Sequence, residues 1–280
     1  ALCSEGAGPR LRGTAVSLMY CGVPIGAALA AMIGIVGYFD DWTVPFYVGG
    51  VLPLLVLPLL LLWLPESAAF KARQAAVSSE PRVPVMDGLF RNGAMLPTAL
   101  LWVAYFFTLM VVYMLISWLP SLLVGQGFTG VQASWVVFTL QIGAAVGTLM
   151  LGVLMNTLRP LAIAALIYGG LLAALAALGI VESFVGMLFA GFAAGVFATG
   201  GQGVLYALAP LFYRTEVRAT GVGTAVAVGR LGAMSGPLVA GKMLALGTGT
   251  VGVMAASAPG LVVAGIAVFY LFVRSRRQAA

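Results

Sequence analysis

The sequence predicts a polytopic α-helical membrane protein, and three observations lead to this fold class. Of the 280 residues, 62% are hydrophobic and only 8% are charged, whereas soluble domains carry about 25% charged residues. Uncharged apolar runs recur along the whole chain, and each is long enough to cross about 30 Å of hydrocarbon as a helix of roughly 20 residues. The basic residues gather in alternate loops between these runs, as they do in the cytoplasmic loops of membrane proteins.

The apolar runs divide into eight predicted transmembrane helices. They cover about 13–37, 42–64, 94–119, 131–155, 160–181, 184–209, 219–246 and 252–273. The longest polar connection, residues 65–92, contains three prolines and separates the second span from the third. Its composition predicts an inter-domain linker, with an ordinary long loop as the alternative.

The positions of Lys and Arg orient the predicted helices. If the eight spans alternate in direction, every Lys and Arg except Arg230 and Lys242 lies on one side of the membrane. The loops on the other side hold Asp40, Asp41 and Glu182. Because cytoplasmic loops are enriched in Lys and Arg, we expect both ends of the chain, including the C-terminus, to be cytoplasmic.

An internal repeat relates the first predicted span to the seventh. Two short segments and two pairs of glycines match at one constant shift: 13–16 with 223–226, Gly22 with Gly232, and Gly26 with Gly236. At the same shift Tyr20 falls opposite Arg230. The two spans are six helices apart and share an orientation, and parallel repeats of six-helix halves are the architecture of the major facilitator transporters.

The repeat predicts that the eight spans are helices 5–12 of this fold, with about four helices before residue 1. The expected domains are residues 1–64, the end of the N-terminal half; residues 65–92, a cytoplasmic linker; and residues 93–280, the C-terminal half. The second, fifth and eighth spans carry almost no polar side chains. This composition suits helices 6, 9 and 12 facing lipid, while the other helices line a central cavity.

Arg230 is the main candidate for a functional residue, because it falls in the middle of a predicted span. A charge there costs roughly 2.5–3.5 kcal/mol on insertion scales and normally faces protein or a water-filled cavity. The planar guanidinium suits a substrate carboxylate. Pairing with a buried carboxylate, gating, and snorkelling to an interface are the alternatives. Lys242, near the end of the same span, is expected to snorkel.

Several uncharged side chains are further candidates for substrate contact. Thr199, Gln202 and Tyr206 share one helical face in the glycine-interrupted sixth span, where hydrogen bonding between helices is the alternative. Gln141 stands alone in the fourth span, and Tyr20 enters through the repeat. In the third span an aromatic stripe formed by Trp102, Tyr105, Leu109 and Tyr113 suits stacking on an aromatic substrate, although ordinary packing is the commoner use of such a stripe.

Other classes of function lack the residues that they need. The chain has no histidine and two cysteines, so we expect no metal and no cofactor. No intramembrane carboxylate pair, nucleophile–base pair or phosphate-binding loop predicts an enzyme. The net charge of +6 comes from residues scattered over loop edges, so we expect no nucleic acid. The predicted partners are the lipid bilayer, protons and a small substrate, and we expect a monomer.

Three motifs resemble the aromatic acid:proton symporter family of the major facilitator superfamily: Arg12-Gly-Thr-Ala-Val, Leu64-Pro-Glu-Ser67, and Arg218-Ala-Thr-Gly-Val-Gly with Arg230-Leu-Gly. The resemblance covers essentially the whole chain. It implies a secondary active transporter in the bacterial inner membrane that imports an aromatic acid of the hydroxyphenylpropionate type with protons, by alternating access. Arg230 would hold the carboxylate, and Gln141, Gln202, Tyr206, Tyr20 and Tyr113 would contact the ring and its hydroxyl.

The resemblance also implies a role in gating for four residues at the cytoplasmic loops: Arg12, Asn156, Arg159 and Arg218. The sequence departs from the superfamily pattern at Asn156, which occupies the place of an acid and therefore argues against a charge-based gate there. The family's acidic motif for proton coupling would precede residue 1. A transporter of another small organic or aromatic acid, and an inactive truncated chain, remain the alternative functions.

Overall fold

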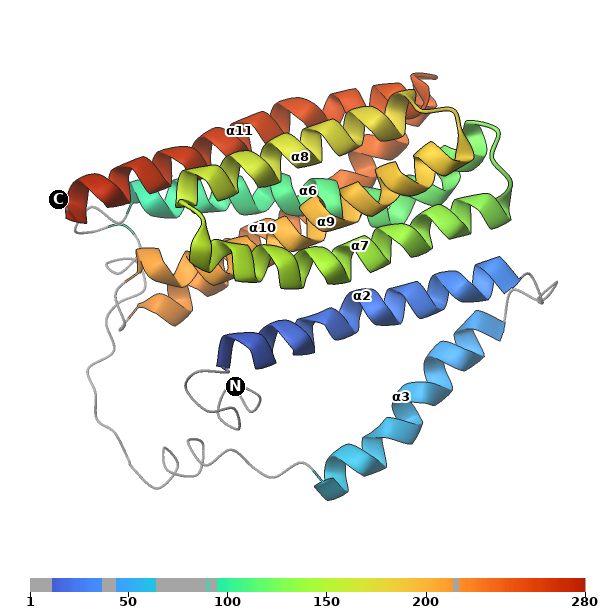
Figure 1. Ribbon diagram of the computed structural model, residues 1–280, viewed down its shortest axis with the longest axis horizontal. Helices are drawn as coiled ribbons and strands as arrows, with labels where there is room; N and C mark the ends of the chain where they lie inside the picture. The colour runs from blue at the N-terminus through green and yellow to red at the C-terminus, as the bar shows by residue number, and fades with distance from the viewer. Residues whose placement is uncertain (1–11, 37–43, 64–89, 91–94, 214–216, 280) are drawn as a thin grey trace.

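The computed structural model describes residues 12–36, 44–63, 90, 95–213 and 217–279, and these residues form helices joined by short turns (Figure 1). The long helices are α2 (Arg12–Val36), α3 (Val44–Trp63), α6 (Met95–Gly125), α7 (Gly130–Thr157), α8 (Pro160–Ile180), α9 (Phe184–Leu208), α10 (Arg218–Ala245) and α11 (Gly249–Ala279). A short 3-10 helix, η1 (Ala209–Phe212), follows α9. The part of the chain described contains no strand, so the predicted all-α class is confirmed.

Each of the eight predicted spans corresponds to one long helix. The helices α6 to α11 are long and apolar enough to cross a membrane, whereas α2 and α3 contain the shorter apolar stretches Leu18–Met32 and Gly49–Leu62. The main differences are at the ends of α6 and α11: α6 continues through Pro120 to Gly125 instead of ending near residue 119, and α11 continues to Ala279 instead of residue 273. Transmembrane helices tolerate such a proline because neighbouring groups satisfy the freed backbone carbonyl. The predicted linker 65–92 lies outside the described residues except for Phe90.

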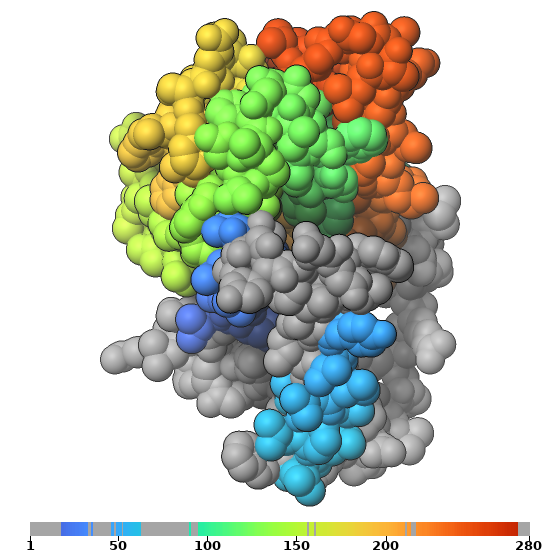
Figure 2. Space-filling view, turned by 90° about the vertical axis from the view of Figure 1, so that its right-hand side faces the viewer, coloured from blue at the N-terminus to red at the C-terminus, as the bar shows by residue number. Residues whose placement is uncertain are grey.

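The helices α6 to α11 form one bundle, and α2 lies along it (Figure 1). In the bundle α6 packs against α10 and α11, α7 packs against α9, and α8 packs against α9 and α11. The contact of α2 with the bundle is made mainly with α7. The helix α3 stands apart from the other described helices (Figures 1 and 2), and its described side chains are exposed.

Glycines set the closeness of the α7–α9 pair. Gly143 and Gly147 of α7 face the backbone of Phe192 and Val196 so closely that an added Cβ atom would overlap their carbonyl oxygens. Gly195 of α9 is equally close to the carbonyl oxygen of Leu140. The two glycines of α7 are four positions apart, the spacing of small residues that lets membrane helices approach to backbone contact.

The pair α6–α10 is built in the same way. A Cβ atom at Gly232 would overlap the carbonyl oxygen of Phe106, and one at Gly236 would overlap that of Met110. Gly22 and Gly26 of α2, their matches in the sequence repeat, have no atom within 4 Å of an added Cβ among the residues described. The matched glycine pairs therefore differ in environment, and only the pair in α10 contacts another described helix closely.

The outer helices α8 and α11 each bury a polar side chain in the bundle. The hydroxyls of Tyr168 in α8 and Thr108 in α6 lie 3.1 Å apart, and both residues are buried. Ser257 in α11 is fully buried and donates to the Val253 carbonyl at 3.0 Å. Apolar side chains such as Ile266 remain exposed, as expected for helices that face lipid.

Candidate functional site

Arg230 lies on the exposed side of α10, next to the glycines that hold this helix against α6. Its Nη1 donates a hydrogen bond to the hydroxyl oxygen of Tyr113 in α6 at 2.5 Å. The guanidinium carbon lies 5.8 Å from the centroid of the Tyr113 ring, which is within the range of a cation–π contact. No carboxylate pairs with Arg230 among the described residues.

The surface around Arg230 is apolar and open. Leu231, Met234 and Leu238 on the neighbouring turns are 58%, 69% and 74% exposed. Lys242 is also exposed, in the last turn of α10, where a cation is favoured by the carbonyl end of a helix. Arg230 thus differs from Lys242 in lying in the middle of its helix, where the surroundings are apolar.

A second group of polar side chains lies on α9. Nε2 of Gln202 donates to the hydroxyl oxygen of Tyr206 at 3.1 Å, which confirms that these two predicted residues share a face. The Tyr206 ring stacks on Tyr20 of α2, with centroids 6.4 Å apart and planes 17° apart. This contact brings together two candidates that the sequence placed in different halves of the fold.

Tyr105 lies between the surroundings of Arg230 and the polar group on α9, whereas the sequence placed it in an aromatic stripe for stacking on a substrate. It is fully buried. Its hydroxyl donates to the Leu205 carbonyl at 3.0 Å. Its ring meets that of Tyr206 edge-on at 5.5 Å. A Cβ atom at Gly229, the residue before Arg230, would lie 3.3 Å from Tyr105. Sequence reasoning missed this role, because helical spacing alone does not show which neighbour a stripe faces.

The burial of Tyr105 corrects the predicted aromatic stripe. Tyr105 and Leu109 in its middle are both fully buried, so the stripe is not a continuous surface for a ligand. Trp102 is half-buried and meets Phe90 edge-on. Tyr113 is half-buried and is the member of the stripe that contacts Arg230. Its interior members pack the helices together, as apolar and aromatic stripes usually do.

The glycines near Gln202 also have a packing role. Glycines in a helix permit a bend or a close approach of a neighbour, and α9 is helical from Phe184 to Leu208. Gly200 contacts Gly147 of α7, and Gly201 contacts Ile167 of α8. These glycines therefore let α9 approach two neighbours at once, on faces other than the one that carries Gln202.

The remaining candidates are spread over the molecule. Gln141 in α7 is 7% exposed and forms no side-chain hydrogen bond with another described residue. Arg159 precedes α8, and Arg218 begins α10; both are exposed. Arg12 begins α2 and Asn156 lies in the last turn of α7, but their side chains lie outside what the structure describes.

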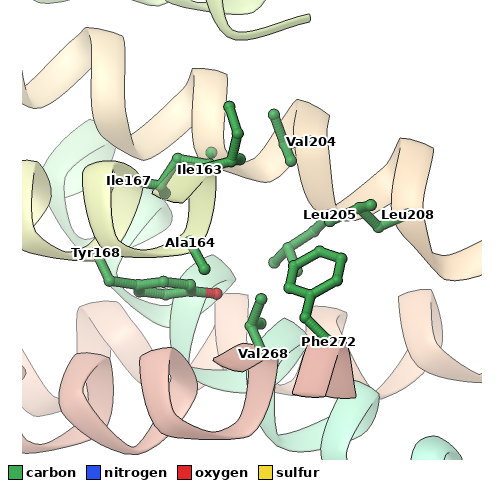
Figure 3. A pocket seen from close by; sticks show the side chains of 10 residues that line it. Ile163, Ala164, Ile167, Tyr168, Val204, Leu205, Leu208, Val268 and Phe272 are labelled. Atoms are coloured by element: carbon green, nitrogen blue, oxygen red, sulfur yellow. The ribbon is translucent and has the colours of Figure 1, made fainter. Parts of the chain in front are cut away.

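The enclosed space found in the described part of the molecule does not contain these residues. A cavity of about 10 Å³ lies between α8, α9 and α11. It is lined by apolar side chains and Tyr168 (Figure 3). It is too small for an aromatic acid, since ligand pockets usually measure about 300–1,000 Å³. A larger depression of about 620 Å³ lies at the C-terminal ends of α6, α8 and α10 and includes Glu182. No group of three metal-ligating residues occurs among the described residues.

Comparisons with known proteins agree with this helical architecture. The family model of the Major Facilitator Superfamily matches residues 1–187. The chain is 66% identical over 277 residues to the 3-(3-hydroxy-phenyl)propionate transporter of Escherichia coli K12. This alignment covers 99% of the present chain and 67% of the Escherichia coli protein. It is 35% identical to the gallate transporter of Pseudomonas putida, over 86% of this chain and 60% of that protein. It is 31% identical to the 4-hydroxybenzoate transporter PcaK of the same species, over 88% of this chain and 61% of that protein.

A solved structure shows the same fold. The bacterial homologue of the human lysosomal transporter Spinster, in an inward-facing and unoccupied conformation, matches with a TM-score of 0.61 at 18% identity. The match covers 98% of this chain and 73% of that one. The chain is a multi-span membrane protein that belongs to the major facilitator superfamily. It is similar in particular to aromatic acid transporters, and it spans about 60–67% of the length of the three relatives described above.

Proposed function

We propose that the chain is part of a secondary active transporter that imports an aromatic acid of the hydroxyphenylpropionate type together with protons. Two observations support this proposal. The relative at 66% identity is a 3-(3-hydroxy-phenyl)propionate transporter. The intramembrane Arg230 is held by Tyr113 and has no carboxylate partner among the described residues.

Arg230 would bind the carboxylate of the substrate. A guanidinium forms two parallel hydrogen bonds with a carboxylate, and the apolar surroundings strengthen this attraction relative to water. Gln202, Tyr206, Tyr20, Gln141 and Tyr113 would contact the ring and its hydroxyl. The hydrogen bond between Gln202 and Tyr206 leaves the amide oxygen of Gln202 free to accept from a phenol.

Proton coupling needs a titratable group in the pathway. The eight helices contain no Asp or Glu, and the chain contains no histidine. The proton carrier in this proposal is therefore an acid outside these eight helices, whereas Arg230 supplies the affinity for the anion.

The proposed topology follows the distribution of basic residues. Residues 1–64 belong to the N-terminal half, 65–92 link the halves in the cytoplasm, and 93–280 form the C-terminal half of a monomer in the bacterial inner membrane, with the C-terminus cytoplasmic. Arg12, Asn156, Arg159 and Arg218 would act at the cytoplasmic gate. Alternating access would move the halves against each other around the Tyr20–Tyr206 contact.

Uptake of labelled 3-(3-hydroxyphenyl)propionate by cells that express the gene encoding this chain tests the proposal. We expect saturable uptake that a protonophore abolishes and that unlabelled phenylpropionates inhibit more strongly than gallate or 4-hydroxybenzoate. Stronger inhibition by either benzoate-type acid would favour the second candidate, a transporter of those acids, which the gallate and PcaK relatives support. Absence of uptake of all these acids would contradict both candidates.

A further inference from the structure

Tyr113 contacts Arg230 in two ways, through its phenol oxygen and through its ring. The phenol oxygen accepts a hydrogen bond from Nη1 at 2.5 Å, and the ring lies 5.8 Å from the guanidinium carbon. The two side chains come from α6 and α10, 117 positions apart in the chain. A hydrogen bond from a charged donor is about twice as strong as one between neutral groups.

The packing of α10 on α6 fixes this contact. Gly232 and Gly236 bring the backbone of α10 against the carbonyl oxygens of Phe106 and Met110, and Tyr113 lies one turn beyond Met110. Gly229 adds a close approach to Tyr105. The backbone that carries Arg230 therefore keeps a fixed distance from the backbone that carries Tyr113, and the orientation of the guanidinium depends on the side-chain contact.

The contact leaves donors on both side chains free. A guanidinium has five N–H donors in a planar fork, and Tyr113 uses one of them. The phenol oxygen accepts through a lone pair, so its own O–H still donates. A long arginine side chain that is not held has many rotamers to lose on binding. Tyr113 restricts these rotamers before an anion arrives, which is preorganisation of the site.

We infer that Tyr113 is a positioning residue for Arg230: its hydroxyl and ring hold the guanidinium so that the remaining N–H groups bind the carboxylate of the substrate. This inference rests on the proposed transport of an aromatic acid. It differs from a stacking role for the Tyr113 ring, because a stacking platform does not need the phenol oxygen. The site then selects a carboxylate over an uncharged group of the same shape.

Uptake kinetics of Tyr113→Phe test the inference, with transport normalised to the amount of protein in the membrane. We expect KM for the labelled acid to rise about ten-fold, equivalent to about 1.4 kcal/mol, with kcat changed less than two-fold. Tyr113→Leu also removes the ring and is expected to raise KM further. Tyr270→Phe is the matched control, since Tyr270 is half exposed on α11 and should leave both constants unchanged.

Inhibition of uptake by the primary amide of the same acid measures the preference for a carboxylate, which a purely structural role of Tyr113 would leave unchanged. The unmodified protein should prefer the acid to the amide, and Tyr113→Phe should reduce this preference about ten-fold. A KM and a preference equal to those of Tyr270→Phe would overturn the inference, and so would a lower kcat with an unchanged KM. The variant Arg230→Ala distinguishes an error about the carboxylate site from an error about the role of Tyr113. Unchanged affinity in this variant overturns the proposed carboxylate site at Arg230 and the inference with it, whereas absence of uptake by the unmodified protein overturns the proposed function itself. Loss of affinity in Arg230→Ala with normal Tyr113→Phe overturns only the role of Tyr113.

Discussion

Gly195 of α9 lies so close to Leu140 of α7 that a Cβ atom on the glycine would overlap the leucine carbonyl oxygen. The clash would be with backbone atoms of the facing helix, which cannot move away by changing a rotamer. The α7–α9 pair therefore depends on the absence of a side chain at this position, and the same holds for Gly143 and Gly147.

Gly195→Ala is expected to destabilise the folded protein by roughly 1–3 kcal/mol, the usual cost of overpacking. The measurement is the thermal unfolding midpoint of the purified protein in detergent. Gly169→Ala in α8 is the control, because no atom lies within 4 Å of its added Cβ. It should be neutral or slightly stabilising, since alanine favours a helix over glycine. Equal midpoints for the two variants would contradict the close packing of α7 on α9.

The buried pair Thr108–Tyr168 predicts a non-additive effect on stability. Thr108→Val leaves the buried Tyr168 hydroxyl without its 3.1 Å partner, at a cost of about 1–3 kcal/mol. Tyr168→Phe in the same protein removes the stranded hydroxyl and should restore part of the loss. Denaturation of both single variants and the double variant measures the coupling. Strictly additive effects would show that the two hydroxyls do not depend on each other.

The helices were predictable, whereas the contacts between them were not. Long uncharged runs determine where transmembrane helices form, so α7 to α10 begin and end within two residues of the predicted spans. The burial of Tyr105 and the contact of Arg230 with Tyr113 depend on helices far apart in the sequence, and helical spacing reports only which residues share a face. The glycines at 200 and 201 showed the same limit, because glycine serves a bend and a close contact equally well.

Gln202 is expected to affect which acids are recognised more than how tightly all acids bind. Its Nε2 donates to Tyr206, and replacement by leucine would remove both this bond and the free amide oxygen proposed to accept from the substrate phenol. Gln202→Leu should therefore reduce the preference for 3-(3-hydroxyphenyl)propionate over 3-phenylpropionate by roughly five- to ten-fold, as one lost hydrogen bond predicts. Competition for uptake measures the ratio. A ratio equal to that of the unmodified protein would place the phenol elsewhere.

The most direct test of the account is the affinity of Arg230→Ala for the labelled acid, measured beside Lys242→Ala. Both variants remove one exposed cation from α10, so they change the net charge equally. Because only Arg230 lies in mid-helix beside Tyr113, Arg230→Ala should weaken binding at least 100-fold, as expected when a bidentate charged contact is lost, while Lys242→Ala should bind normally. Normal binding by Arg230→Ala, or an equal loss in both variants, would contradict the role of Arg230 as the carboxylate site.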